Sequence, residues 1–71
     1  MRPGDVIKFR KNDGTIAIAM IGNYGRAHRK GLEEKTYKVK NIPTQTDYRY
    51  NVFEDEVIEL LSQKDYPEYY L

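Results

Sequence analysis

Residues 5–21 read DVIKFRKNDGTIAIAMI, and this stretch decides the fold because it predicts a β-hairpin. Its centre, Asp13-Gly14, suits a type I′ turn, since Gly adopts positive φ freely and Asp tolerates it better than most residues. A two-residue loop places Phe9 opposite Ile18 and gathers the large apolar side chains on one face: Ile7, Phe9, Ile16, Ile18 and Met20. We therefore predict this register, or a four-residue loop of the same parity, over a three-residue loop that sets Phe9 against Ala17.

The apolar face of a hairpin needs further strands to cover it in water. Residues 35–42, 48–53 and 57–61 predict three of them; the last also fits helical spacing but is too short for a helix. Residues 22–25 predict a turn or bulge, and residues 26–34 an exposed loop. The fold class predicted is all-β, a small five-stranded barrel, because closure removes exposed strand edges. The core should also include Tyr37, Val39, Tyr50, Val52, Ile58 and Leu60.

Both ends of this predicted barrel resemble SH3-like barrels of the KOW type. The resemblance rests on PGDVIKF at residues 3–9 and YNVFEDEVIEL at residues 50–60. In such barrels a Gly-Asp pair opens the first strand, and a Phe-acidic-acidic turn leads into the last one, so the resemblance implies a five-stranded SH3-like barrel. The whole chain is also similar to YorP-type proteins of Bacillus prophages, which implies this fold and a phage origin but no activity. The chain lacks the tryptophan and the Ala-Leu-Tyr-Asp-Tyr motif of peptide-binding SH3 domains, so proline-rich ligands are not expected.

The 71 residues predict one small domain, with a barrel over residues 1–62 and an aromatic tail over residues 63–71. There is no cysteine, which excludes disulfides and thiolate sites and fits a reducing cytoplasm. The sequence contains no apolar run long enough for a transmembrane helix and no signal-peptide core at the N-terminus. We therefore expect a cytoplasmic, monomeric protein that does not enter membranes.

Charge is distributed unevenly along the chain. Residues 1–40 carry ten Lys or Arg against four Asp or Glu, a balance of +6, and residues 41–71 carry two against seven, a balance of −5. Such asymmetry can mark a basic binding face. The alternative is that the two halves neutralise each other in the fold, with the basic residues meeting acids such as Asp47, Asp55 and Glu59.

The basic residues and one tyrosine are the candidate nucleic-acid site. Small barrels bind nucleic acid through charged strands and loops, with exposed aromatic rings stacking on bases. The residues concerned are Lys8, Arg10, Tyr24, Arg26, Arg29, Lys30, Lys38 and Lys40. The competing interpretations are a packed anchor for Tyr24 and protection of strand edges for the lysines. The alternative function is a protein-interaction module, which the tail aromatics would suit unless the tail folds back over the barrel mouth.

Catalytic and metal sites are not predicted. His28 is the only histidine and is expected to be a solvated loop residue, since one histidine without cysteine cannot make a structural zinc site. Two acidic runs, Glu33-Glu34 and Glu54-Asp55-Glu56, lack calcium-loop spacing and are expected to be solvated turns. We therefore expect a non-enzymatic protein with no cofactor and no metal.

Overall fold

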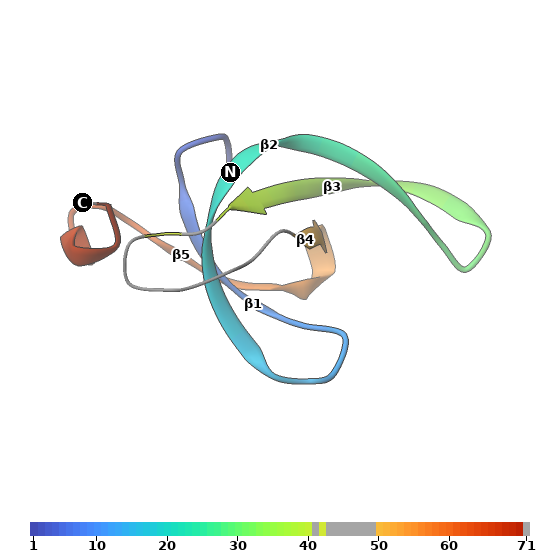
Figure 1. The fold of residues 1–71 in the computed structure, drawn as a ribbon, viewed down its shortest axis with the longest axis horizontal. Coiled ribbons are helices and arrows are strands. Elements are labelled where there is room, and N and C mark those ends of the chain that lie inside the picture. Colours follow the sequence, from blue (N-terminus) through green and yellow to red (C-terminus); the bar gives the residue numbers. More distant parts are fainter. Residues whose placement is uncertain (41, 43–49, 71) are drawn as a thin grey trace.

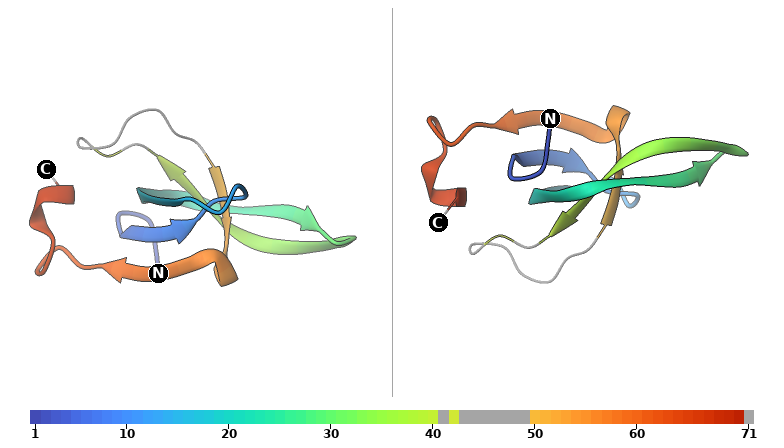
Figure 2. Two further views of the ribbon diagram at one scale, coloured as in Figure 1. Left: turned by 90° about the horizontal axis from the view of Figure 1, so that it is seen from below. Right: turned by 90° about the horizontal axis from the view of Figure 1, so that it is seen from above.

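The computed structural model describes residues 1–40, 42 and 50–70, and these residues form one antiparallel sheet (Figure 1). The described strands are β1 (Val6–Arg10), β2 (Ile16–Arg29), β3 (Leu32–Lys40), β4 (Tyr50–Phe53) and β5 (Val57–Leu61), in the order β4-β3-β2-β1-β5. Two short 3-10 turns, η1 (Glu54–Glu56) and η2 (Pro67–Tyr70), complete the described elements. The predicted all-β class is confirmed, whereas the sheet is strongly curved but not closed into a barrel (Figure 2). No helix among the described residues is long and apolar enough to cross a membrane.

The first hairpin differs by one residue from the predicted register. Phe9 lies opposite Ala17, not Ile18. The loop has three residues, because the Lys11 N–H donates to the Thr15 carbonyl (2.8 Å) and the Gly14 N–H donates to the Lys11 carbonyl (2.9 Å). Gly14 has the predicted positive φ of +88°, but in the turn-plus-bulge geometry of a three-residue loop, so the type I′ prediction is wrong. The Asp13 carboxylate fixes this loop by accepting from the Thr15 N–H and hydroxyl (3.0 and 2.7 Å).

The change of register exchanges the two faces of β2. Ala17 and Ala19 now share the core face with Ile7 and Phe9, while Ile16 is 49% exposed. Of the other predicted core residues, Val39 and Val52 are buried, Ile18, Met20 and Tyr37 are half-buried, and Ile58 and Leu60 are exposed. The burial of the Tyr50 side chain lies outside what the structure describes. The prediction failed because it assumed that only one face of the hairpin is covered.

The second hairpin is much longer than predicted. Residues 26–34 are not a loop: β2 and β3 pair as far as Arg29 and Leu32, and the turn consists of Lys30 and Gly31 alone. Both turn residues have positive φ, 54° and 79°, which is the geometry of a type I′ turn. A register shift at Gly22 confirms the predicted bulge, although β2 continues through it.

The sheet is buried on both faces near β1. One cluster lies on the inner side of the curved sheet and contains Ile7, Phe9, Ala19, Ile21, Val39 and Val52. The other contains Val6, Ile42 and Leu61, with Ile18, Met20, Tyr66, Tyr69 and Tyr70 packed against it. The tail therefore folds back, as the alternative interpretation held, but onto a face of the open sheet, where its half-buried tyrosines pack against the core.

The Tyr70 hydroxyl joins the tail to the two strands beneath it. It accepts from the Val6 N–H (3.0 Å) and donates to the Leu61 carbonyl (2.6 Å). These two residues lie opposite each other in β1 and β5, so a side chain satisfies backbone groups at the end of this ladder.

Phe9→Ala should lower the free energy of unfolding by about 3–5 kcal/mol, because truncating a fully buried ring leaves a cavity. Ile16→Ala should change it by about 0.5 kcal/mol, as surface substitutions do. Urea unfolding measures both. A loss for Ile16→Ala as large as that for Phe9→Ala would contradict the observed register.

Tyr70→Phe should cost about 1–3 kcal/mol of stability, because it leaves the Val6 N–H and the Leu61 carbonyl, both buried, without the hydroxyl that bonds them. Tyr69→Phe is the matched control, since the described residues offer its hydroxyl no hydrogen bond. Hydrogen exchange of the Val6 amide should accelerate in the first variant and stay unchanged in the second. Equal behaviour of the two variants would show that the Tyr70 hydroxyl contributes nothing.

Candidate nucleic-acid interface

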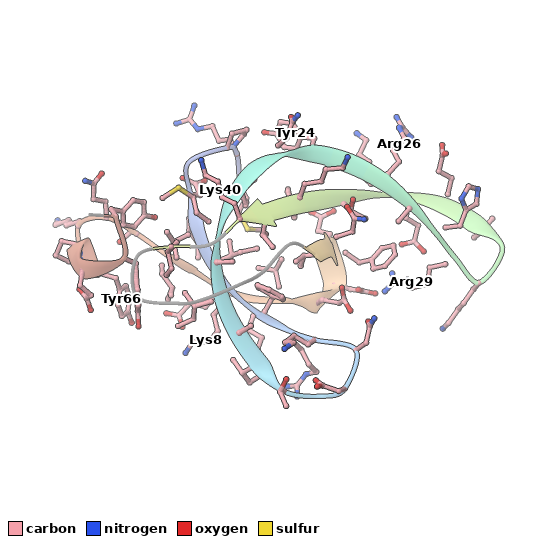
Figure 3. The ribbon with its side chains drawn as sticks, viewed as in Figure 1. Lys8, Tyr24, Arg26, Arg29, Lys40 and Tyr66 are labelled. Atoms are coloured by element: carbon pink, nitrogen blue, oxygen red, sulfur yellow. The ribbon has the colours of Figure 1, made fainter. Side chains whose placement is uncertain are left out.

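The predicted site residues do not share one face of the sheet. Successive side chains of a strand point to opposite faces, so Tyr24 and Arg26 lie on one side of β2 and Arg29 on the other (Figure 3). Lys38 and Lys40 alternate with Tyr37 on β3 and lie on the side of Arg29. The remaining three, Lys8 and Arg10 of β1 and Lys30 of the turn, lie elsewhere on the sheet.

Part of the basic charge is paired. Lys8 forms an ion pair with Glu59 (3.6 Å), and Arg26 forms one with Glu33 (3.6 Å). The Arg10 guanidinium donates to the Gly14 carbonyl at 3.5 Å. Within the described part of the chain Lys30, Lys35, Lys38 and Lys40 make no ion pair. The exposed pairs at 3.6 Å are weak and screened by salt, so they compete little with a bound phosphate.

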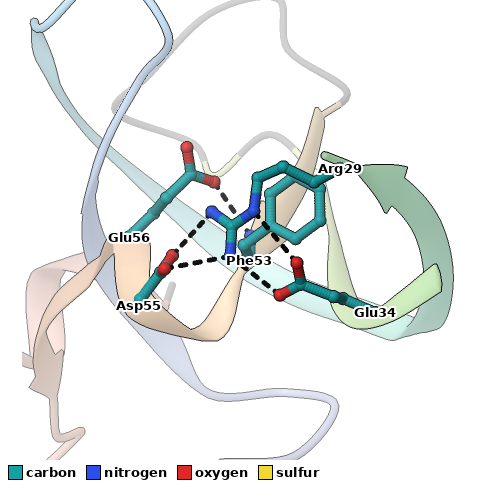
Figure 4. A network of polar contacts seen from close by, with 5 residues as sticks. All are labelled: Arg29, Glu34, Phe53, Asp55 and Glu56. Atoms are coloured by element: carbon teal, nitrogen blue, oxygen red, sulfur yellow. Dashed lines mark hydrogen bonds and ion pairs between the residues drawn. The ribbon is translucent and has the colours of Figure 1, made fainter. Parts of the chain in front are cut away.

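The Arg29 side chain is fully engaged in contacts within the fold. Its guanidinium donates two hydrogen bonds to Glu34 (3.2 and 2.8 Å) and two to Asp55 (both 2.9 Å), and it lies 4.0 Å from the centre of the Phe53 ring (Figure 4). The hydrogen bonds to Asp55 and then to Glu34 raise the pKa of Arg29, and the bonds from Arg29 lower the pKa of Asp55. This arrangement ties the far end of the β2–β3 hairpin to η1 and leaves Arg29 no free donor face for a ligand.

The two residues of the predicted set that do come together, Tyr24 and Arg26, line a groove. Tyr24 lies opposite Tyr37, with ring centroids 6.2 Å apart and planes inclined at 51°. Arg26 lies opposite Lys35, one step further along the same face. These four side chains and Glu54 of η1 border a groove of about 450 Å³ that also touches Gly25 and Thr36.

Both tyrosine rings of this groove are held in place by contacts with other parts of the chain. Tyr24 is 54% exposed, and its hydroxyl donates to the Met1 carbonyl (3.3 Å), so its ring is both anchored and accessible. Tyr37 is half-buried against the core. Burial, then the charge of Glu54 and the neighbouring Tyr24, raise the pKa of the Tyr37 phenol, which therefore stays neutral around pH 7. The groove thus offers an aromatic floor with cations on one border.

On the opposite face of the hairpin, the lack of a side chain at Gly25 makes room for the Lys38 stem. A Cβ at Gly25 would lie 2.9 Å from the Lys38 Cε atom and 3.1 Å from the Thr36 hydroxyl oxygen. The Lys38 stem therefore lies across Gly25 next to Thr36, which is buried. Lys38 is placed by this contact on the face away from the tyrosine pair.

Three groove residues, Lys35, Tyr37 and Glu54, were not among the predicted site residues. Sequence alternation alone placed Tyr37 inward, and the pairing of β3 with β2 that sets it beside Tyr24 is a long-range register.

His28 is exposed as predicted, but on a strand rather than a loop. Among the described residues no three His, Cys, Asp or Glu side chains come together as metal ligands would.

No protein-family model matches the chain, and searches of curated proteins and of solved structures find no match either.

The Arg29–Asp55 contact should make stability fall in acid. Because the folded pKa of Asp55 lies below its ordinary value of 3.8, the stabilisation is complete above that pH and is lost as the pH falls through the folded pKa. Asp55→Asn should therefore flatten the acid limb of a plot of stability against pH. Asp65→Asn is the control, since Asp65 bonds the neutral Ser62 hydroxyl. Parallel acid limbs for wild type and Asp55→Asn would contradict this role.

Proposed function

We propose that this protein is a non-enzymatic binding module that takes single-stranded nucleic acid in the groove bordered by Tyr24, Arg26, Lys35, Tyr37 and Glu54. The observation that carries the proposal is the cross-strand tyrosine pair next to a cross-strand pair of cations. Aromatic side chains stack on unpaired bases of any sequence, and Lys or Arg beside them neutralise the phosphates that link those bases.

The charge of the hairpin supports this proposal. Residues 22–40 carry six Lys or Arg against two Glu, a balance of +4. The hairpin projects from the rest of the sheet (Figure 1), so Lys30, Lys38 and Lys40 add to the field around the groove even though they do not line it. An exposed ring can stack only on a base that is free of its own stack, and this favours single strands over duplex.

We also propose that the curved sheet is related to the SH3-like small barrels and that the chain has a phage origin. The strand order, in which β5 returns to the side of β1, supports the kinship. So does η1, because the Phe53-acidic turn leads directly into β5, as the resemblance implies.

A protein-interaction module is the second candidate. The tail tyrosines no longer support it, since they pack on Val6 and Leu61. The edge strand β5 does, because Ile58 and Leu60 are each 47% exposed there and β5 pairs only with β1 in the described sheet. Exposed edges of this kind accept an added strand from another chain.

Fluorescence anisotropy with a labelled ten-nucleotide single strand tests the proposed function. Two to four phosphate contacts predict a slope of log affinity against log salt of about −1.4 to −2.8. Tyr24→Ala should weaken binding about 5- to 150-fold through lost stacking. Arg26→Ala should weaken it and reduce the slope, whereas Arg10→Ala, an exposed arginine outside the groove, should not.

Two outcomes would contradict the proposal. One is an equal loss for Arg10→Ala and Arg26→Ala, which would make the binding a general charge effect. The other is no detectable binding of single or double strands at low salt, which would make the protein interaction through the β5 edge the better-supported function.

A further inference from the structure

Glu54 is the acidic member of the groove and has no ion pair within the described residues. Its place is fixed by its neighbours in η1. Asp55 is bound by Arg29 at 2.9 Å, and the Glu56 carboxylate accepts from the Phe53 N–H at 2.9 Å (Figure 4). The Glu54 backbone is therefore held from both sides, and its exposed side chain stands at the border of the groove beside Lys35.

A carboxylate in this position limits how a single strand can lie. It repels phosphates, so the backbone of the strand is directed toward Arg26, on the strand of the groove further from η1. A base stacked on the tyrosine pair then turns its hydrogen-bonding edge toward Glu54. An ionised carboxylate only accepts hydrogen bonds, so it favours bases that present donors on that edge.

The common bases differ sharply in this respect. Guanine presents the N1–H and an N2 amino hydrogen side by side, and both can bond the two oxygens of one carboxylate. Adenine and cytosine present one amino donor next to a ring nitrogen that repels the second oxygen. Thymine and uracil present one N–H between two carbonyl groups. Bidentate hydrogen bonds to an ionised group are the strongest and the most selective of these arrangements.

We propose that the groove selects an unpaired guanine, with Glu54 accepting from its N1–H and N2 amino group while the base stacks on Tyr24 and Tyr37. This inference rests on the proposed function and adds the base preference. It also supplies a second reason for single strands, because base pairing in a duplex occupies the same edge of guanine.

The test compares ten-nucleotide oligo(dT) strands that carry one central guanine, adenine, cytosine or hypoxanthine. Hypoxanthine is guanine without the N2 amino group. Wild-type protein should bind the guanine strand about 5- to 150-fold more tightly than oligo(dT), the discrimination typical of one bidentate contact to a base. The hypoxanthine strand should lose most of this gain.

Glu54→Gln should abolish the guanine preference and strengthen binding of oligo(dT), since a negative charge is removed from the groove. Glu68→Gln, an exposed glutamate in η2, changes the net charge equally and should keep the preference. Thermal unfolding of both variants checks that the fold is retained. Equal wild-type affinity for the guanine and oligo(dT) strands, or a preference that survives Glu54→Gln, overturns this inference and leaves the proposed function standing. Failure to bind any strand overturns the proposed function itself.

Discussion

Val6 and Ile7 are neighbours in β1, point to opposite faces of the sheet, and are both completely buried. A strand with this property needs cover on two sides, which a small sheet with one wet face cannot give. On one side the curvature of β2 and β3 brings Val39 and Val52 over Ile7. On the other side the tail places its tyrosines over Val6, and the Tyr70 hydroxyl is positioned to bond both strands beneath it. The tail is thus required by the burial of β1.

This requirement explains how much of the fold could be predicted. The strands around residues 6–10, 16–21 and 35–40 follow from local alternation, and the strand at residues 57–61 follows from its short length. Neither signal needs knowledge of distant neighbours. The register of the first hairpin does not, because alternation indicates one buried face and this hairpin has two. Ile18 and Met20 pack against a cluster that contains Leu61, more than forty positions later in the chain, a contact that no local pattern reports. The two-residue turn of the second hairpin was missed for another reason. Lys30 has positive φ there, and lysine rarely adopts this conformation, so it does not indicate a turn.

The uneven distribution of charge could be read from the sequence, but the individual ion pairs could not. The acidic second half of the chain does approach the basic first half, through Asp55 at Arg29 and Glu59 at Lys8. Pairing therefore removes Arg29 from the predicted interface, because the same planar fork that suits a phosphate suits two carboxylates. Lys35, which no local signal distinguished from the other lysines, remains without an ion pair among the described residues and borders the groove. Which cations stay available is decided by the pairing of strands far apart in the sequence.

The bulge at Gly22 connects the core to the proposed groove. Ile21 lies opposite Val39, and without an extra residue in β2 the next pair on that face would join Asn23 to Tyr37. The bulge shifts the register by one, so that Tyr24 takes this place instead. One face of β3 can then bury Val39 under Ile21 and, two residues earlier, present Tyr37 beside an exposed Tyr24. A single inserted residue thereby lets the hairpin leave the core and continue as an aromatic surface, and it places Arg26, two residues beyond Tyr24, on that same surface.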